Sequence, residues 1–390
     1  MASYEEAMSI FRELGEKKGE ADTLNNFGTV YLGIDFNRAL QYYEDSLKMY
    51  NEIGNKVGAS KVCNNIGILY NQLGKYDRAL EYLKRSLHIQ QERGSKHGEE
   101  TAYVNIGNIH SARDENQEAL RFYEAALKIA RHTGNRESEG ICLNNIGLKL
   151  DTLGAYQEAL KSLEKTVTIT QDIGDKRTEA AALTGLGQVH QHIGDYDAAR
   201  AFYDRALQIG KEQNVSWVKF GNLVSQAEFY LLLDETEKAK RYIDAAYELS
   251  QEVASQSYIA TTMMLMCEYY LCTARADTFM KTMHELEKYI EMRTNGQNAA
   301  IAVMLGRYYV MVKEFEKADK QFTQALEIHK KIGNRLEYGK VYYYRGMMEL
   351  ARENERAIRF FKQSVEIFDA LGAKGWKQKS SSHLAERSSS

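Results

Sequence analysis

One segment of this chain recurs about every 40 residues, and that period restricts the fold more than any other feature of the sequence. The segments LNNFGTVY, CNNIGILY and LNNIGLKL are three of its copies. Each copy has a small residue at one position, here called the repeat position, and consecutive repeat positions lie 39 or 40 residues apart: Gly28, Gly67, Gly107, Gly147, Gly187, Ala227, Cys267, Gly306 and Gly346. A fixed period of about 20 to 50 residues is typical of stacked repeats. We therefore expect nine repeats that pack mainly on their neighbours.

Each unit continues into a second segment with helical spacing. In the first unit the small residue Ala39 is followed by the bulky Tyr43 and then by the small Ser46. Offsets of four and seven residues place these side chains on one face of a helix. Small residues let neighbouring helices approach, and the bulky residue fills the space between them. The pattern therefore predicts two helices in each unit.

Glycine, rather than proline, is expected to end these helices. Pairs such as Gly54-Asn55 and Gly134-Asn135 close five of the units. Glycine adopts the left-handed conformation that ends a helix, and the following polar residue can cap the next one. The chain contains no proline, although average usage would give roughly 20 in a chain of this length. Because proline disrupts helices, its absence favours a nearly all-helical chain.

These motifs resemble the tetratricopeptide repeat. The pattern N-x-G-x-x-Y, followed by A-x-x-x-Y/F-x-x-A, recurs in register over roughly residues 20–372. The usual unit has about 34 residues. The longer unit here is similar to those of kinesin light chains, of LGN/Pins-type scaffolds and of bacterial peptide-sensing regulators. The resemblance implies an all-α fold: a right-handed superhelical solenoid of antiparallel helix pairs, in which the first helix of each pair lines the concave face.

We predict a single solenoid over residues 1–372, followed by a polar capping helix or a disordered tail over residues 373–390. The solenoid is expected to begin with a partial helix and to continue through five regular, two divergent and two further repeats, over residues 1–20, 21–219, 220–300 and 301–372. The seventh repeat departs most, because Phe279 and Leu286 replace both small residues and methionines cluster there. Two interpretations stay open: a looser core filled by adaptable side chains, or an apolar surface for a partner helix or a second copy.

Composition and charge argue against several classes of function. The net charge is −3, and the acidic and basic residues are intermixed, so no basic stripe for nucleic acid is expected. No apolar run approaches the roughly 20 residues of a membrane span, and the N-terminal residues lack the apolar stretch of a signal peptide. The four cysteines form no CxxC pair, which argues against a disulfide framework. We therefore predict a cytoplasmic protein without nucleic-acid or membrane partners.

Catalytic motifs are also missing from the sequence. It contains no HExxH motif, P-loop or nucleophile elbow. His110 and His190 occupy the position that Tyr31 and Tyr70 hold in other repeats, so we interpret them as packing residues between helices. The prediction is a protein that is not an enzyme and that needs no cofactor or metal ion.

A row of asparagines is the main candidate for a binding site. Asparagines stand two or three residues before the repeat position in four successive repeats. An asparagine amide both donates and accepts hydrogen bonds, so such a row could hold the main chain of an extended peptide. By the resemblance, the row and the residues one after the repeat position line the concave groove. The predicted peptide-binding residues are Asn25, Asn26, Thr29, Asn64, Asn65, Asn105, Asn108, Asn144, Asn145, Gln188 and Glu228.

The same asparagines have a structural interpretation, because an asparagine two residues before the glycine is common in tetratricopeptide consensus sequences. The favoured hypothesis is a non-enzymatic scaffold that binds an unidentified protein or peptide in the groove of repeats 1–5. One alternative is a sensory or regulatory module of a larger signalling protein, such as a transcription regulator, kinase or cyclase. Another is a regulator resembling the peptide-controlled phosphatases of bacilli, although residues 1–20 leave no room for their N-terminal helical bundle. Self-association through repeats 6–8 is a further alternative.

Overall fold

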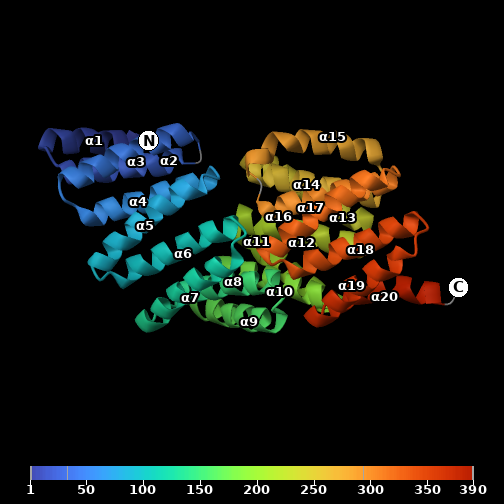
Figure 1. Ribbon diagram of the computed structural model, residues 1–390. Coiled ribbons are helices and arrows are strands. Elements are labelled where there is room, and N and C mark those ends of the chain that lie inside the picture. Colours follow the sequence, from blue (N-terminus) through green and yellow to red (C-terminus); the bar gives the residue numbers. More distant parts are fainter. Residues whose placement is uncertain (1, 33, 293, 389–390) are drawn as a thin grey trace. The chain divides into compact units, whose positions relative to one another are not determined.

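The computed structural model describes residues 2–32, 34–292 and 294–388, and over this part of the chain the protein is all-helical (Figure 1). Helices make up 87% of the chain, and the described residues contain 20 α-helices and no strand. Residues 1–135 form one compact unit, unit 1, and residues 136–390 form another, unit 2. No described helix is both long and apolar enough to cross a membrane.

The helices described in unit 1 are α1 (Ala2–Leu14), α2 (Lys17–Tyr31), α3 (Phe36–Glu52), α4 (Lys56–Gln72), α5 (Tyr76–Glu92), α6 (Lys96–Ala112) and α7 (Asn116–Thr133). Those in unit 2 are α8 (Arg136–Thr152), α9 (Tyr156–Ile173), α10 (Lys176–Ile193), α11 (Tyr196–Gln213), α12 (Ser216–Leu232), α13 (Thr236–Val253), α14 (Gln256–Cys272), α15 (Ala276–Leu286), the 3-10 helix η1 (Glu287–Met292), α16 (Asn295–Met311), α17 (Phe315–Ile332), α18 (Arg335–Ala351), α19 (Arg356–Leu371) and α20 (Lys374–Ser388). The even-numbered helices from α2 to α18 carry the repeat positions, so each is the first helix of its pair.

Helices end where the glycine and asparagine signals predict. Gly54 adopts a left-handed backbone with φ of 69° after α3. The side chain of Asn55 then accepts a hydrogen bond from the backbone N–H of Gly58 at 3.0 Å, which caps α4. This bond satisfies one of the backbone donors that the first turn of a helix leaves free.

Within each pair, the repeat position is small because a large side chain of the second helix packs directly on it. A Cβ atom added at Gly28 would lie 2.6 Å from the ring of Tyr43, and one added at Gly306 would lie 2.5 Å from the ring of Phe322. Tyr43 and Phe322 are almost fully buried. The repeating glycine therefore sets how closely the two helices of a pair approach.

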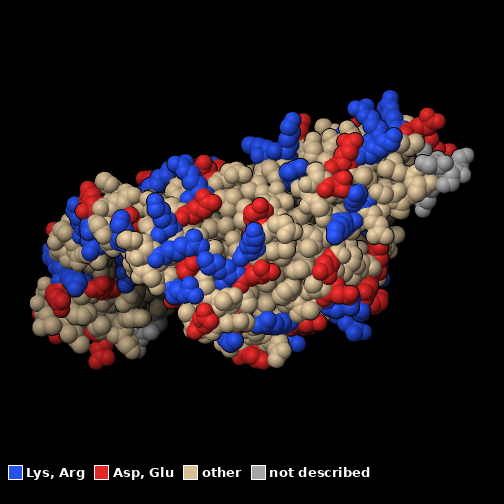
Figure 2. All heavy atoms as spheres, turned by 90° about the horizontal axis from the view of Figure 1, so that it is seen from below, with Lys and Arg blue, Asp and Glu red and all other residues tan. Residues whose placement is uncertain are grey.

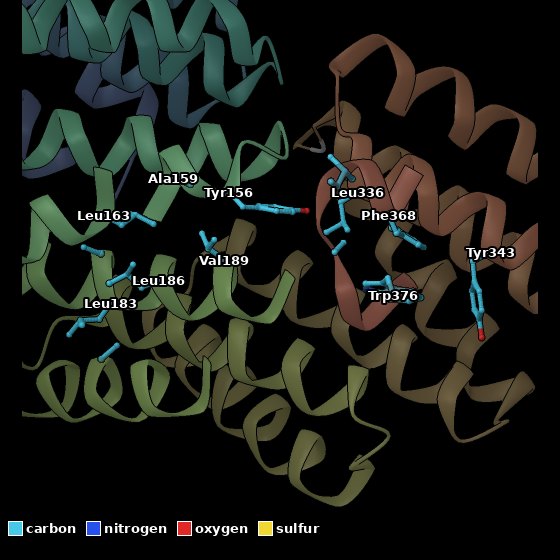
Figure 3. Packing of buried hydrophobic residues seen from close by; sticks show 14 of the residues in the cluster. Tyr156, Ala159, Leu163, Leu183, Leu186, Val189, Leu336, Tyr343, Phe368 and Trp376 are labelled. Carbon is cyan, nitrogen blue, oxygen red and sulfur yellow. The ribbon is translucent and has the colours of Figure 1, made fainter. Parts of the chain in front are cut away.

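Unit 2 closes on itself, because its last helices pack against its first ones. One apolar cluster joins Tyr156 of α9 to Leu336 of α18 and to Phe368 and Leu371 of α19. Figure 3 shows the Tyr156 ring extending toward Leu336. The contact is tight: a Cβ atom added at Gly154 would lie 2.4 Å from Leu371. Helices from both ends of the unit thus share one core.

The beginning of α20 completes this closure. A Cβ atom added at Gly194, in the turn between α10 and α11, would lie 2.8 Å from the backbone nitrogen of Gly375. One added at Gly375 would lie 2.1 Å from the hydroxyl oxygen of Tyr196. Trp376, one residue further on, is buried in the same cluster as Tyr156. Glycine at both positions therefore allows the backbones to meet.

In the seventh repeat, the unusual large residues lie in the core. Phe279 and Leu286 are fully buried, together with Met263 and Met283. The ring of Phe279 stacks on Tyr308 with the ring centroids 5.2 Å apart. These side chains fill space between helices, as the core interpretation of this repeat expects.

Candidate functional site

A cavity of about 650 Å³ lies among seven helices of unit 2. Its walls come mainly from α10, α12, α14, α16 and α18, which are the first helices of successive pairs, and also from α17 and α20. Its size falls within the range of about 300–1,000 Å³ that ligand sites occupy. The cavity therefore lies on the face that the first helices share.

The repeat spacing explains which side chains reach the cavity. On α16, the lining residues Ala300, Val303, Arg307 and Val310 are separated by three or four residues around the repeat position Gly306. Steps of three and four keep side chains on one face of a helix. Because the pairs repeat, the equivalent face of each neighbouring first helix lines the same space. Much of the wall is apolar, with Leu231, Leu265, Met264, Met304, Met347 and Tyr344 among its residues.

Arg307 is the central positive charge of the cavity. Its guanidinium group forms an ion pair with Glu268 of α14, and its Cζ atom lies 4.7 Å from the centroid of the Tyr344 ring. Burial by itself would lower the pKa of Arg307, but the groups around it, with the Glu268 carboxylate foremost, raise the pKa above its usual value. Arg307 therefore stays charged and is held between α14 and α18.

A second ion pair joins two residues of α18. Lys340 donates a hydrogen bond to Glu337 at 2.5 Å, and its Nζ atom lies 5.1 Å from the centroid of the Trp376 ring. Burial raises the pKa of Glu337, but Lys340 together with His329 and His192 holds the pKa below its usual value. Lys379 of α20 lies 4.0 Å from Asp234. Most charges of the cavity thus face an opposite charge.

Glu228 of α12 is the exception among the charged residues of this wall. No hydrogen bond or ion pair of its carboxylate occurs within the described part of the chain. Its side chain is exposed to solvent, although the concave walls around it reduce its hydration. This desolvation raises the pKa of Glu228 to about 7, while Lys340 and His192 act in the opposite direction. The cavity therefore contains one carboxylate without a partner at hydrogen-bonding distance.

The α10 side of the cavity is polar and largely satisfied. His192 contacts the Asp151 carboxylate at 2.8 Å through Nδ1. Gln188 donates to the Ser225 hydroxyl at 3.0 Å, which joins α10 to α12 just outside the lining residues. Of the residues predicted from the sequence, Glu228 is the one that lines the cavity.

In unit 1, the predicted asparagines contact one another. The Asn65 side chain donates to the side-chain Oδ1 atom of Asn25 at 2.8 Å, and the Asn105 side chain donates to the Oδ1 atom of Asn64 at 2.7 Å. Each bond joins the first helices of two neighbouring repeats. Asn25 is buried, whereas Asn64, Asn65 and Asn105 are half-buried. These bonds use part of the hydrogen-bonding capacity of each amide and leave the rest.

The other predicted residues of unit 1 lie beside this row. Tyr43 donates to Thr29 at 3.2 Å, and Tyr123 donates to Asn108 at 2.8 Å. Each bond joins the two helices of one pair. Asn26 is half-buried on α2.

The remaining two asparagines belong to unit 2. Asn144 is buried and donates to the side chain of its neighbour Asn145 at 3.4 Å. The Oδ1 atom of Asn144 has no hydrogen-bond partner in the described part of the chain. Neither residue lines the cavity.

Sequence reasoning missed most of the charged residues of the cavity, although a signal for them was present. Glu228, Glu268 and Arg307 each stand one residue after a repeat position, as Thr29 and Asn108 do in earlier repeats. The residue after the repeat position is thus acidic in repeats 6 and 7 and basic in repeat 8. Reading this position in the later repeats would have placed these three charges on neighbouring first helices. Lys340 and Trp376 do not stand at this position of a repeat, so the same signal does not identify them.

The described residues contain no group of three or more histidine, cysteine, aspartate or glutamate side chains that could hold a metal ion. The Lys and Arg side chains are interspersed with Asp and Glu on the face shown in Figure 2. The cavity of unit 2 combines an apolar wall with a few oriented charges, which is the usual construction of a ligand-binding site.

Comparison with known protein structures shows the same helical fold at low sequence identity. A Rap protein complexed with competence and sporulation factor superposes with a TM-score of 0.62 at 14% identity, over 81% of this chain and 99% of that one. The Rap conjugation gene regulator of plasmid pLS20, in complex with the Phr* peptide, gives a TM-score of 0.62 at 12% identity, over 80% and 95%. NprR in complex with its cognate peptide NprX gives 0.60 at 18% identity, over 76% and 82%.

Comparison with sequence families identifies the repeat itself. No curated protein sequence matches the chain. A model of anaphase-promoting complex subunit 5 matches residues 192–273. The model of the tetratricopeptide repeat matches residues 2–52, 59–132, 98–172 and 150–212, which together make up more than half of the chain. The chain therefore belongs to the tetratricopeptide repeat family.

Proposed function

We propose that this protein is a non-enzymatic interaction module that binds a peptide, or a peptide segment of a partner protein, in the cavity of unit 2. The observation that carries the proposal is the cavity itself, which has an apolar wall and oriented charges. The first helices of five successive pairs contribute to it, so it is a product of the repeat stack rather than of one loop. A peptide is a suitable ligand because it offers apolar and charged groups at fixed spacing.

The solved structures with the same fold support this choice of ligand. Three of them were determined with a bound signalling factor or peptide. Their low identity to this chain means that they support the class of ligand and leave its sequence open. The same fold is compatible with the alternative of a sensory module within a larger signalling protein, and with a phosphatase-like regulator.

The energetics favour the cavity over the asparagine row as the main anchor. A net hydrogen bond contributes about 0.5–1.5 kcal/mol, so four such bonds give about 2–6 kcal/mol. Micromolar binding requires about 8 kcal/mol. Asn25, Asn64, Asn65 and Asn105 also use part of their capacity on one another. The row therefore stays a proposal for secondary contacts with a peptide main chain.

Selection from a random library of phage-displayed heptapeptides tests the proposal. The wild-type chain should enrich a defined set of sequences. The variant Ala300→Trp should not, because a large side chain at this lining position fills the cavity. Ala370→Trp is the matched control, since Ala370 is exposed on α19 and lies outside the cavity. Circular dichroism should show that all three proteins are folded.

Three results would count against the cavity as the binding site. The wild-type chain could enrich no sequence, which would reject peptide binding. Ala300→Trp could enrich the same peptides as the wild type, which would place the site elsewhere. Alternatively, Ala370→Trp could lose binding as fully as Ala300→Trp, which would attribute the loss to a general effect of tryptophan.

A further inference from the structure

Charge pairing in the cavity of unit 2 indicates what the ligand must bring. Four acidic residues line this space, and three of them already face a basic residue. Glu268 pairs with Arg307, Glu337 pairs with Lys340 at 2.5 Å, and Asp234 lies 4.0 Å from Lys379. Glu228 alone among these four has no such partner within the described residues. The protein thus holds one uncompensated negative charge in this wall.

The arrangement of its neighbours keeps Glu228 from finding a partner within the protein. Arg307 is held by Glu268 and by the ring of Tyr344. Lys340 is held by Glu337 and by the ring of Trp376, 5.1 Å away. A basic side chain with both a carboxylate and an aromatic ring as partners loses stabilising contacts if it moves to a third group. Glu228 therefore remains available to a group that enters from outside.

From these contacts we infer that the cavity recognises a peptide carrying a basic side chain, and that the lysine ammonium or arginine guanidinium group binds the carboxylate of Glu228. This inference rests on the peptide-binding function proposed above and adds a chemical requirement to it. The apolar wall formed by residues such as Leu231, Met264 and Leu265 would contact the aliphatic part of the same side chain. Long basic side chains combine an apolar stem with a charged end, which matches these surroundings.

An acidic or neutral ligand fits the site less well. An acidic side chain beside Glu228 would add a second negative charge close to Glu268 and Glu337. A neutral ligand would cover Glu228 and remove its remaining water without supplying a partner, which is unfavourable for a charged group. A basic group avoids both costs.

The ionisation of Glu228 makes the inference testable by pH. The titratable groups that act on it are His192 of α10, Tyr203 of α11, Glu268 of α14, and Glu337 and Lys340 of α18; Asp234, Arg307 and Lys379 line the same wall. Desolvation raises the pKa of Glu228 to about 7 in the free protein. A bound cation favours the ionised carboxylate, so binding must release a proton when the pH is below 7. Affinity should therefore be higher at pH 8 than at pH 6, by an amount set by how far the pKa of Glu228 lies above its usual value.

The decisive experiment repeats the heptapeptide selection with Glu228→Gln. Peptides selected by the wild-type chain should share a lysine or arginine at one position. Glu228→Gln should lose this preference while still enriching the apolar residues at other positions. Glu248→Gln is the matched control, because Glu248 is exposed on α13 and lies outside the cavity. It should select the same peptides as the wild type.

Calorimetric titration of one selected peptide then measures the contact directly. Replacing its basic residue by glutamine should weaken binding to the wild-type chain by at least tenfold and have little effect on binding to Glu228→Gln. The rise in affinity between pH 6 and pH 8 should disappear in Glu228→Gln. If the rise persists there, another group such as His192 is responsible and the inference is wrong.

The selection also separates the two proposals. Enrichment of peptides without a common basic residue, or the same basic preference in Glu228→Gln, would overturn the role of Glu228 and leave peptide binding intact. A wild-type chain that enriches no sequence would overturn both.

Discussion

Units 1 and 2 use the same position of the repeat in different ways. In unit 1, Thr29 and Asn108 stand one residue after the repeat position and accept hydrogen bonds from a tyrosine of their own helix pair. In unit 2, Glu228, Glu268 and Arg307 hold that position and line a cavity. One backbone pattern therefore supports either a satisfied neutral surface or a charged cavity wall. The choice depends on side chains that leave the helix pairing unchanged.

The largest expected effect concerns the repeat whose core departs from the consensus. Phe279→Ala restores the small residue that other repeats have at this position, as Ala39 illustrates in unit 1. Because Phe279 is fully buried and stacks on Tyr308, the change should lower the free energy of unfolding by about 3–5 kcal/mol. Urea unfolding followed by circular dichroism measures it. Unchanged or increased stability would show that repeat 7 does not depend on this side chain for its core.

A second comparison tests the closure of unit 2 with two glycines that differ in their surroundings. Both Gly94 and Gly194 have a left-handed backbone, with φ of 66° and 87°. A Cβ atom at Gly94 would meet nothing within 4 Å, whereas one at Gly194 would lie 2.8 Å from the Gly375 backbone. Gly94→Ala should cost about 1 kcal/mol through backbone strain. Gly194→Ala should cost about 2–4 kcal/mol, because steric overlap adds to the strain.

Thermal unfolding of these two variants measures the difference. Equal losses for Gly94→Ala and Gly194→Ala would mean that the turn after α10 and the start of α20 do not pack closely in solution. A larger loss for Gly194→Ala supports the closure of unit 2.

A smaller effect is expected from the asparagine row of unit 1. Asn65→Ala removes the donor to Asn25 and leaves the buried Asn25 oxygen without this bond. The free energy of unfolding should fall by about 1–2 kcal/mol, and the affinity for a selected peptide should stay within twofold of the wild type. Chemical unfolding and peptide titration on the same preparation measure both. An unchanged stability together with a tenfold loss of affinity would favour the binding role of the row.

The smallest effect on stability is expected for Glu228→Gln. Unlike the substitutions above, it should stabilise the protein. The pKa of Glu228 is raised to about 7 in the folded protein, so the charged carboxylate destabilises the fold at high pH, and this cost disappears as pH falls toward 4. Glu228→Gln should therefore stabilise the protein at pH 8 by less than about 1 kcal/mol, because contact with solvent reduces the effect. Near pH 4 the two proteins should unfold alike. A destabilised variant at pH 8 would contradict the cost assigned to this carboxylate.

The sequence predicts the fold well, because the fold follows from local signals that recur nine times. The repeat glycines, the small and bulky residues of the second helices and the Gly-Asn turns each act within about 40 residues. The family and the all-helical fold were confirmed on this basis. The asparagine row stays a prediction, since Asn25 and Asn64 bond to their neighbours without showing whether a ligand also contacts them.

The cavity of unit 2 depends on relations that no single repeat contains. Lys340 and Trp376 reach the same space as Glu228 only because small rotations between repeats accumulate until α18 and α20 face α12. Residues more than 100 positions apart, such as Tyr156 and Leu336, then share one cluster. The residues that follow the repeat positions would have identified Glu268 and Arg307 from the sequence. The 40-residue period, however, does not indicate that the last helices of unit 2 pack against its first ones.

Photo-crosslinking of a selected peptide tests the central claim, that the ligand binds in the cavity of unit 2, most directly. The peptide would carry a photoreactive phenylalanine analogue at each position in turn, and mass spectrometry would identify the labelled residues of the full chain. Labels are expected on α12, α14, α16 and α18, at residues such as Met264, Met304 and Met347. Labels confined to α2, α4 and α6, beside Asn25, Asn64 and Asn105, would contradict it.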